Sequence, residues 1–100
     1  MTQKLRVGVI GAGIAARHLA GFDWNKDLFE VPVLCSLDEE RGRELCASHG
    51  IGEYTQDADT LFARDDLDVI DICTPPDTHF ALCKKAIESG KHVICEKPLF

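Results

Sequence analysis

The sequence of 100 residues lacks any apolar run long enough to span a membrane, and it lacks an excess of positive charge. Its 11 Lys and Arg are outnumbered by 17 Asp and Glu, which gives a formal net charge of -6 at pH 7. Proteins that bind nucleic acids use clustered Lys and Arg to hold the phosphate backbone, so this balance argues against a protein of that class. Any anion that the chain binds must be held locally, by backbone N–H groups.

The composition also lacks the bias of a disordered chain. Hydrophobic residues make up 45% and charged residues 28%, which is ordinary for a globular protein. A chain of this length can bury one core. The amino-terminal stretch MTQKLRVGVIGAG breaks at glycine after a short apolar run, so we expect no signal peptide and a cytoplasmic location.

The sequence contains no pair of cysteines at the C-x-x-C spacing that is common in zinc sites. All five fall in apolar stretches, at Cys35, Cys46, Cys73, Cys83 and Cys95. Because a free Cys packs as a small hydrophobe, we interpret them as reduced core residues and predict no metal site. A zinc site or a disulfide framework is the less favoured alternative.

Short apolar runs alternate with helical patterns along the chain. Strand patterns occur at residues 5–11, 31–37, 68–75 and 91–98, with a weaker one at 52–55. Helical patterns occur at residues 14–21, 38–50, 57–64 and 75–90. This alternation implies right-handed crossovers and a parallel sheet with both faces covered. We predict one α/β domain, a doubly wound Rossmann fold with five strands that stops before a sixth.

Two of the helical patterns have readable ends. Asp38 and Asp77 are placed to cap the helices at 38–50 and 75–90, and Gly50 and Gly90 to end them. Apolar residues repeat at helical spacing in the later helix, at Phe80, Cys83 and Ile87. Acidic residues are frequent between residues 57 and 68, and we interpret them as a solvated face rather than a metal site.

A glycine motif joins the first strand to the first helix. The stretch GAGIAA matches G-x-G-x-x-G/A, with Gly11 at the tight turn and Gly13 where the backbone can approach a pyrophosphate. Ala16 is small enough for the helix to pack on the strand. Ile14 and Ala15 follow at the helix N-terminus, whose N–H groups attract anions. Such glycines can also be purely structural, but this position in an α/β chain favours dinucleotide binding.

The end of the second strand bears on the choice between NAD and NADP. Carboxylates at this position bond the ribose 2′-OH of NAD, and here the residue is Ser36. Ser36 can donate to a 2′-phosphate, and Arg41 or Arg43 lies about one helical turn further on. The pattern slightly favours NADP. The alternative remains open that Ser36 only ends the strand and that Asp38 serves NAD.

Two further motifs follow the fourth and fifth strands. They are TPPDTH at residues 74–79 and EKP at 96–98. Together with GAGIAA, in this order and spacing, they resemble the glucose-fructose oxidoreductase and inositol dehydrogenase (Gfo/Idh/MocA) family over the whole chain. The family consists mainly of NAD(P)-dependent oxidoreductases of sugars, polyols and related compounds.

The resemblance implies roles for the residues of these motifs. Thr74 and Pro75 would contact the cofactor near its nicotinamide half, with His79 supporting their loop. Glu96 would lie by the nicotinamide ribose. Lys97 would be catalytic, because an ammonium beside the reacting oxygen stabilises a developing alkoxide and can join proton transfer. Alternatively, Glu96 and Lys97 are a solvated pair.

Members of this family continue into a sixth strand and an α/β substrate domain with a catalytic His, and they generally form homo-oligomers through that domain. These 100 residues end before such a domain, so we expect them to bind dinucleotide weakly and to catalyse nothing alone. A non-catalytic regulatory module is the main alternative, and a non-redox enzyme that retains NAD is a third. His18 and His49 are interpreted as helix-surface residues, and Asp71, inside an apolar strand, has no functional account.

Overall fold

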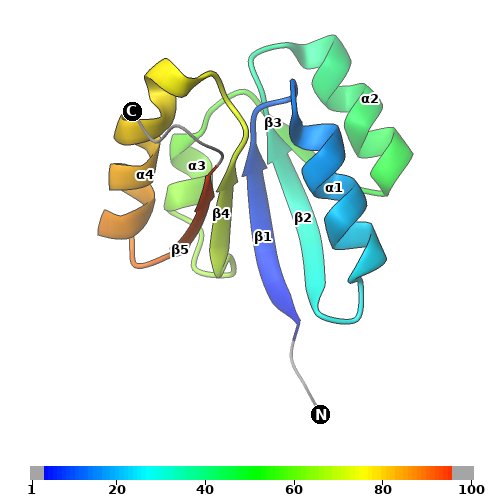
Figure 1. The fold of residues 1–100 in the computed structure, drawn as a ribbon, viewed down its shortest axis with the longest axis horizontal. Helices are drawn as coiled ribbons and strands as arrows, with labels where there is room; N and C mark the ends of the chain where they lie inside the picture. Colours follow the sequence, from blue (N-terminus) through cyan, green and yellow to red (C-terminus); the bar gives the residue numbers. More distant parts are fainter. Residues whose placement is uncertain (1–3, 96–100) are drawn as a thin grey trace.

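The computed structural model describes residues 4–95 as a five-stranded parallel sheet with helices on both faces (Figure 1). The strand order is β3-β2-β1-β4-β5. The strands span Leu5–Ile10 (β1), Phe29–Cys35 (β2), Glu53–Thr55 (β3), Val69–Ile72 (β4) and His92–Cys95 (β5). All four neighbouring pairs are parallel, so the predicted doubly wound α/β fold is confirmed.

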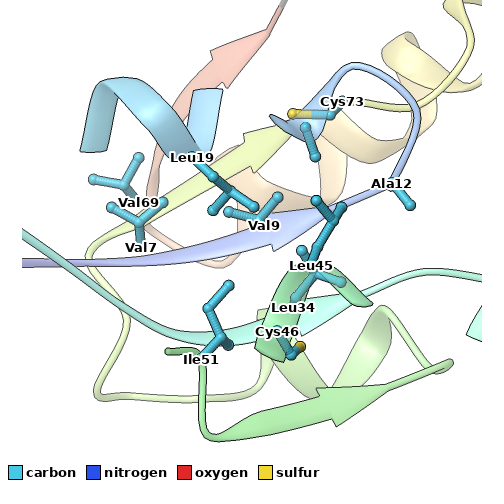
Figure 2. Close-up of a cluster of buried hydrophobic side chains, with 11 residues drawn as sticks. Val7, Val9, Ala12, Leu19, Leu34, Leu45, Cys46, Ile51, Val69 and Cys73 are labelled. Atoms are coloured by element: carbon cyan, nitrogen blue, oxygen red, sulfur yellow. The ribbon is translucent and has the colours of Figure 1, made fainter. Parts of the chain in front are cut away.

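The helices are divided between the two faces of the sheet. They span Ala15–Trp24 (α1), Glu39–His49 (α2), Asp59–Phe62 (α3) and His79–Glu88 (α4), and a short 3-10 turn, Pro76–Thr78, precedes α4. One core cluster joins α1 and α2 to one face, and Figure 2 shows Leu19 of α1 packed over Val7 and Val9 of β1. The other cluster packs Leu61 of α3 and Ala86 of α4 on the opposite face.

Alternation along the strands supplies both clusters. In β1, Val9 lies in the first cluster and Ile10 in the second, because successive side chains of a strand point to opposite faces. In β4 the same holds for Val69 and Ile70. Full burial of such side chains stabilises the fold by about 1.5–3 kcal/mol each.

Local capping is partly as predicted. The Asp38 carboxylate accepts a hydrogen bond from the Arg41 N–H at 3.0 Å, and Gly50 ends α2 with φ 67°, so both predictions for this helix are confirmed. The Asp77 prediction is wrong. The 3-10 turn moves the start of α4 to His79 with Thr78 at the N-cap, and no side chain caps this helix.

The apolar stripe predicted for α4 is shifted around the helix. Phe80 and Ile87 are 62% and 66% exposed, whereas Ala86 is fully buried and Cys83 is half-buried. The buried face of the helix instead carries His79, Leu82, Cys83 and Ala86. Within residues 4–95, β5 is an outer strand of the sheet, as expected from its place in the chain.

Three of the cysteines, Cys35, Cys46 and Cys73, are buried, while Cys83 and Cys95 are half-buried. None of these five residues, all within the described part of the chain, forms a disulfide. Their placement agrees with the interpretation as core residues for the first three and only in part for the other two. In the part of the chain that the structure describes, no helix has the length and apolar character needed to cross a membrane.

Candidate dinucleotide site

A cleft of about 580 Å³ lies at the carboxyl ends of β1, β2 and β4. Three segments line it: the loop after β1, the turn between β2 and α2, and the loop after β4. The lining contains most of the predicted cofactor residues, namely Gly11, Gly13, Ile14, Ser36, Arg41, Thr74, Pro75 and His79. The carboxyl edge of a parallel sheet, where the strand order reverses, is where such folds bind ligands.

The glycine loop has one closed and one open position. Gly11 has φ 110°, and a Cβ there would lie 2.7 Å from the carbonyl carbon and oxygen of Cys73. Its N–H donates to the Cys35 carbonyl at 2.7 Å, which ties the loop to β2. Gly13 is exposed, and nothing lies within 4 Å of a Cβ placed there. Gly11 therefore serves the fold, and Gly13 leaves room for a ligand.

The start of α1 meets the cleft at Ile14, which lines it. Ile14 is the N-cap residue and makes no side-chain capping bond. Ala15 is fully buried in the core and does not line the cleft, so any contact it makes with a ligand must come from its N–H group. Ala16 packs against the core cluster, in agreement with the small third position of the motif.

Ser36 is held more tightly than the sequence indicated. It is 4% exposed, and its hydroxyl donates to the Asp38 carbonyl at 2.8 Å. Tyr54 donates its phenolic hydrogen to the Ser36 carbonyl at 2.6 Å. A Cβ on Gly42 would lie 2.3 Å from the Ser36 Oγ, so the first turn of α2 fits directly over these groups. The Ser36 hydroxyl must give up a hydrogen bond before it can donate to a ligand.

The charged residues of α2 differ in their access to the cleft. Asp38 and Arg41 line it, and the Arg41 guanidinium lies 3.4 Å from the exposed Glu44 carboxylate. Arg43 lies elsewhere, paired with Glu39 at 2.8 Å and 4.9 Å from the centre of the Tyr54 ring. The hydrogen bond that Arg43 donates to Glu39 raises the pKa of Arg43. Of the two arginines predicted to contact the cofactor, only Arg41 reaches the cleft.

A chain of hydrogen bonds fixes the loop after β4. Thr78 donates its hydroxyl hydrogen to the Pro75 carbonyl at 2.8 Å, so the Thr74 hydroxyl is the donor in the 2.5 Å contact with Thr78. His79 is buried, and its Nε2 donates to the Thr74 carbonyl at 2.7 Å. The sequence placed His79 in support of this loop, and its position agrees with that role. Glu96, Lys97 and Pro98 lie outside the described residues.

A polar cluster lies behind the glycine loop, and we did not predict it from the sequence. His18 of α1, interpreted as a surface residue, places its Nδ1 2.8 Å from both carboxylate oxygens of Asp71 in β4. The Cys73 Sγ lies 3.4 Å from the same nitrogen. One nitrogen, oxygen or sulfur atom from each of the three side chains lies within 4.8 Å of the others. Among the described residues, this group could therefore hold a metal ion. His18 and Asp71 are 53 residues apart, so only the strand order brings them together.

A parallel sheet of this order, with a glycine loop opening onto a helix at its carboxyl edge, defines a dinucleotide-binding domain. Residues 5–100 match the family described as "Oxidoreductase family, NAD-binding Rossmann fold". The chain belongs to this Gfo/Idh/MocA family.

The relatives are oxidoreductases several times longer than this chain. Levoglucosan dehydrogenase of Pseudarthrobacter phenanthrenivorans is 33% identical over an alignment of 105 positions, which covers 97% of this chain and 27% of the relative. The crystal structure of an oxidoreductase domain protein from Kribbella flavida superposes with a TM-score of 0.89 at 35% identity, over 98% of this chain and 28% of that one. A levoglucosan dehydrogenase solved with NADH and L-sorbose gives 0.89 at 31% identity, with the same coverage. The chain thus spans little more than a quarter of the relatives it matches.

Proposed function

We propose that the cleft binds NAD(P) and that this chain is the cofactor-binding part of an oxidoreductase of sugars, polyols or related hydroxy compounds. The observation that carries the proposal is the open approach to Gly13, where no atom lies within 4 Å of a Cβ position. The first N–H groups of a helix have no intrahelical partner, and they attract a pyrophosphate. The nicotinamide, when bound, supplies the hydride chemistry.

The class of substrate is proposed from the relatives and from the EKP motif. One relative is named as a levoglucosan dehydrogenase and another as a D-apiose dehydrogenase. Lys97 would act at the substrate oxygen and Glu96 at the nicotinamide ribose, roles that rest on the resemblance. Because substrate contacts in such enzymes come mainly from a further domain, these 100 residues alone would bind the dinucleotide weakly and turn nothing over.

The cleft favours NADP slightly over NAD. Arg41 lines it, and within residues 4–95 its guanidinium is paired with the exposed Glu44 across a long 3.4 Å contact, so it can turn toward a 2′-phosphate. The Asp38 carboxylate is engaged in capping Arg41 N–H, which keeps it directed at the helix rather than at the ribose. Ser36 can add a hydrogen bond to a phosphate if it releases the Asp38 carbonyl.

Cofactor choice is tested by titrating NADPH and NADH into the chain and following nicotinamide fluorescence. Arg41→Ala should weaken NADPH binding about tenfold, the value of one charge-assisted hydrogen bond, and leave NADH unchanged. Arg43→Ala is the matched control, because Arg43 pairs with Glu39 away from the cleft. Tighter binding of NADH than NADPH by the unaltered chain would reverse the preference. Binding of neither would overturn the proposed function.

Catalysis is tested in the protein that contains this domain together with whatever follows it. Sugars and polyols are screened for reduction of NADP and NAD. Lys97→Ala should lower kcat by at least about 100-fold, in the range for a positioned acid or base. Lys84→Ala, on the exposed side of α4, is the control. Cofactor binding with no turnover of any hydroxy compound would favour the regulatory module.

A further inference from the structure

The pair formed by His18 and Asp71 joins two elements that border the cleft. His18 lies one turn into α1, and its side chain is 13% exposed. Asp71 is fully buried in β4, opposite Val9 of β1. The imidazole Nδ1 is equally distant, at 2.8 Å, from the two carboxylate oxygens. We assign Asp71 as ionised, so that its oxygens accept the hydrogen bond and the His18 Nδ1 donates it.

The same part of β4 also shapes the glycine loop. The Cys73 N–H donates to the Ile10 carbonyl at 2.7 Å, and Gly11 packs directly on the Cys73 backbone. The chain from β1 to α1 is therefore attached to β4 at two points, by its loop at Cys73 and by its helix at Asp71. Between these two points lie Gly13 and the first turn of α1.

A hydrogen bond between α1 and β4 favours one rotation of the helix, which apolar packing alone specifies less well. Leu19 already packs α1 on the sheet, but the hydrophobic effect behind such packing has no direction of its own. The hydrogen bond from His18 to the Asp71 carboxylate has a direction, so it favours one rotation of the helix about its axis. A buried carboxylate is costly without a donor, which further favours one arrangement of the helix.

From this geometry we infer that His18 and Asp71 are a positioning pair, which sets the rotation of α1 so that its first N–H groups point at the pyrophosphate. The inference rests on the proposed function, since it assumes that the cleft binds a dinucleotide. Neither side chain lines the cleft, so the pair acts through the helix rather than by contact with the ligand.

The test compares three substitutions of His18 in the chain. Asn places an amide donor near the position of Nδ1, Gln places the same group one methylene further out, and Leu fills similar space with no donor. The dissociation constants for NADPH and NADH are measured by fluorescence, and that for adenosine by NMR titration. Thermal unfolding of each variant gives a separate measure of stability.

Both Leu and Gln should weaken dinucleotide binding about tenfold, the effect of misdirecting a helix N-terminus, and Asn should restore it to within about threefold. Adenosine, which has no pyrophosphate, should bind all variants alike. Equal binding of the dinucleotide by the Asn and Gln variants would overturn the inference, and this comparison decides it even if the Leu variant does not fold. Stoichiometric Zn²⁺ binding that is lost in Cys73→Ala would also overturn it, because an ion would then hold the cluster. Failure of the unaltered chain to bind any dinucleotide would instead refute the proposed function.

Discussion

Gly11 and Cys73 are in such close contact that no side chain fits between them. A Cβ at Gly11 would lie 2.7 Å from the carbonyl carbon and the carbonyl oxygen of Cys73, both of them backbone atoms of the strand-end loop. Gly11 also has φ 110°, a conformation that favours glycine. The first glycine of the motif is thus required by the contact of β1 with β4, before any ligand is considered.

Gly11→Ala should therefore destabilise the chain by about 2–4 kcal/mol, from backbone strain together with the overlap at Cys73. Urea unfolding followed by circular dichroism measures the loss. A decrease below about 0.5 kcal/mol, the range of ordinary surface substitutions, would contradict the contact.

Gly13→Ala should leave stability unchanged and weaken dinucleotide binding. Its Cβ meets nothing within 4 Å, so the free energy of unfolding should stay within about 0.5 kcal/mol of the original. The added methyl group occupies the approach to the helix N-terminus, so dinucleotide affinity should fall at least about tenfold. The two measurements on one protein sample separate fold from binding. Unchanged affinity would remove Gly13 from the site.

Gly42→Ala tests the packing of α2 over the end of β2. Its Cβ would lie 2.3 Å from the Ser36 Oγ and 2.5 Å from a ring carbon of Tyr54, so we expect a loss of about 1–3 kcal/mol. Gly21→Ala in α1 is the matched control. Nothing lies within 4 Å of its Cβ, and replacing a helical glycine by alanine should stabilise the chain by about 0.5–1 kcal/mol. Equal effects at the two positions would contradict the close contact at Gly42.

Asp66 should contribute to the loss of stability in acid. Hydrogen bonds from Arg64, at 2.7 Å, and from Arg6, at 3.1 Å, hold the pKa of its carboxyl well below the usual value. The folded state thus favours the ionised form. The stabilisation is complete above the pKa of the unfolded chain, about 3.9, and is lost as the pH falls from there toward the folded-state pKa.

Asp66→Asn should accordingly flatten the dependence of unfolding free energy on pH below about 4, measured by urea titrations between neutral pH and pH 3. Asp66 is 43% exposed, so solvent screening keeps the effect small. The neighbouring exposed Asp65→Asn controls for the loss of one negative charge. Parallel pH profiles for the original chain and the Asp66 variant would contradict the ion pairs.

Cys35 should be unreactive in the folded chain. Burial, with a smaller contribution from the charge of Asp57, raises the pKa of its thiol from 9.0 to about 11. At pH 8 the thiol is protonated, and iodoacetamide should label Cys35 only after unfolding, whereas the half-buried Cys83 should be labelled earlier. Mass spectrometry of peptides measures both rates.

Because the folded-state pKa of Cys35 is raised, its contribution to the free energy of unfolding is complete below about pH 9 and is lost as the pH rises toward 11.

Patterns within a few residues of chain were read correctly where local physics decides the outcome. The Asp38 cap depends on a partner three residues away, so its residue types carry the information. The glycine loop was recognised from its motif, although Gly11 itself is constrained by the distant Cys73. Asp77 failed as a cap because a 3-10 turn intervenes, and that turn is held by the hydroxyl of Thr78 on the Pro75 carbonyl. Helix propensities do not locate the first residue of a helix to within one turn.

The sequence by itself determined the alternation of strands and helices, the parallel sheet and the place of the phosphate loop, because apolar periodicity and the glycine motif are both contained in short stretches of chain. Only the tertiary structure decided what His18 does, since its acceptor, Asp71, comes from a strand 53 residues away. It likewise decided that the Ser36 hydroxyl is already engaged and that Arg41, rather than Arg43, reaches the cleft. Contacts of this kind depend on strand order and helix rotation, which no single stretch of the chain encodes.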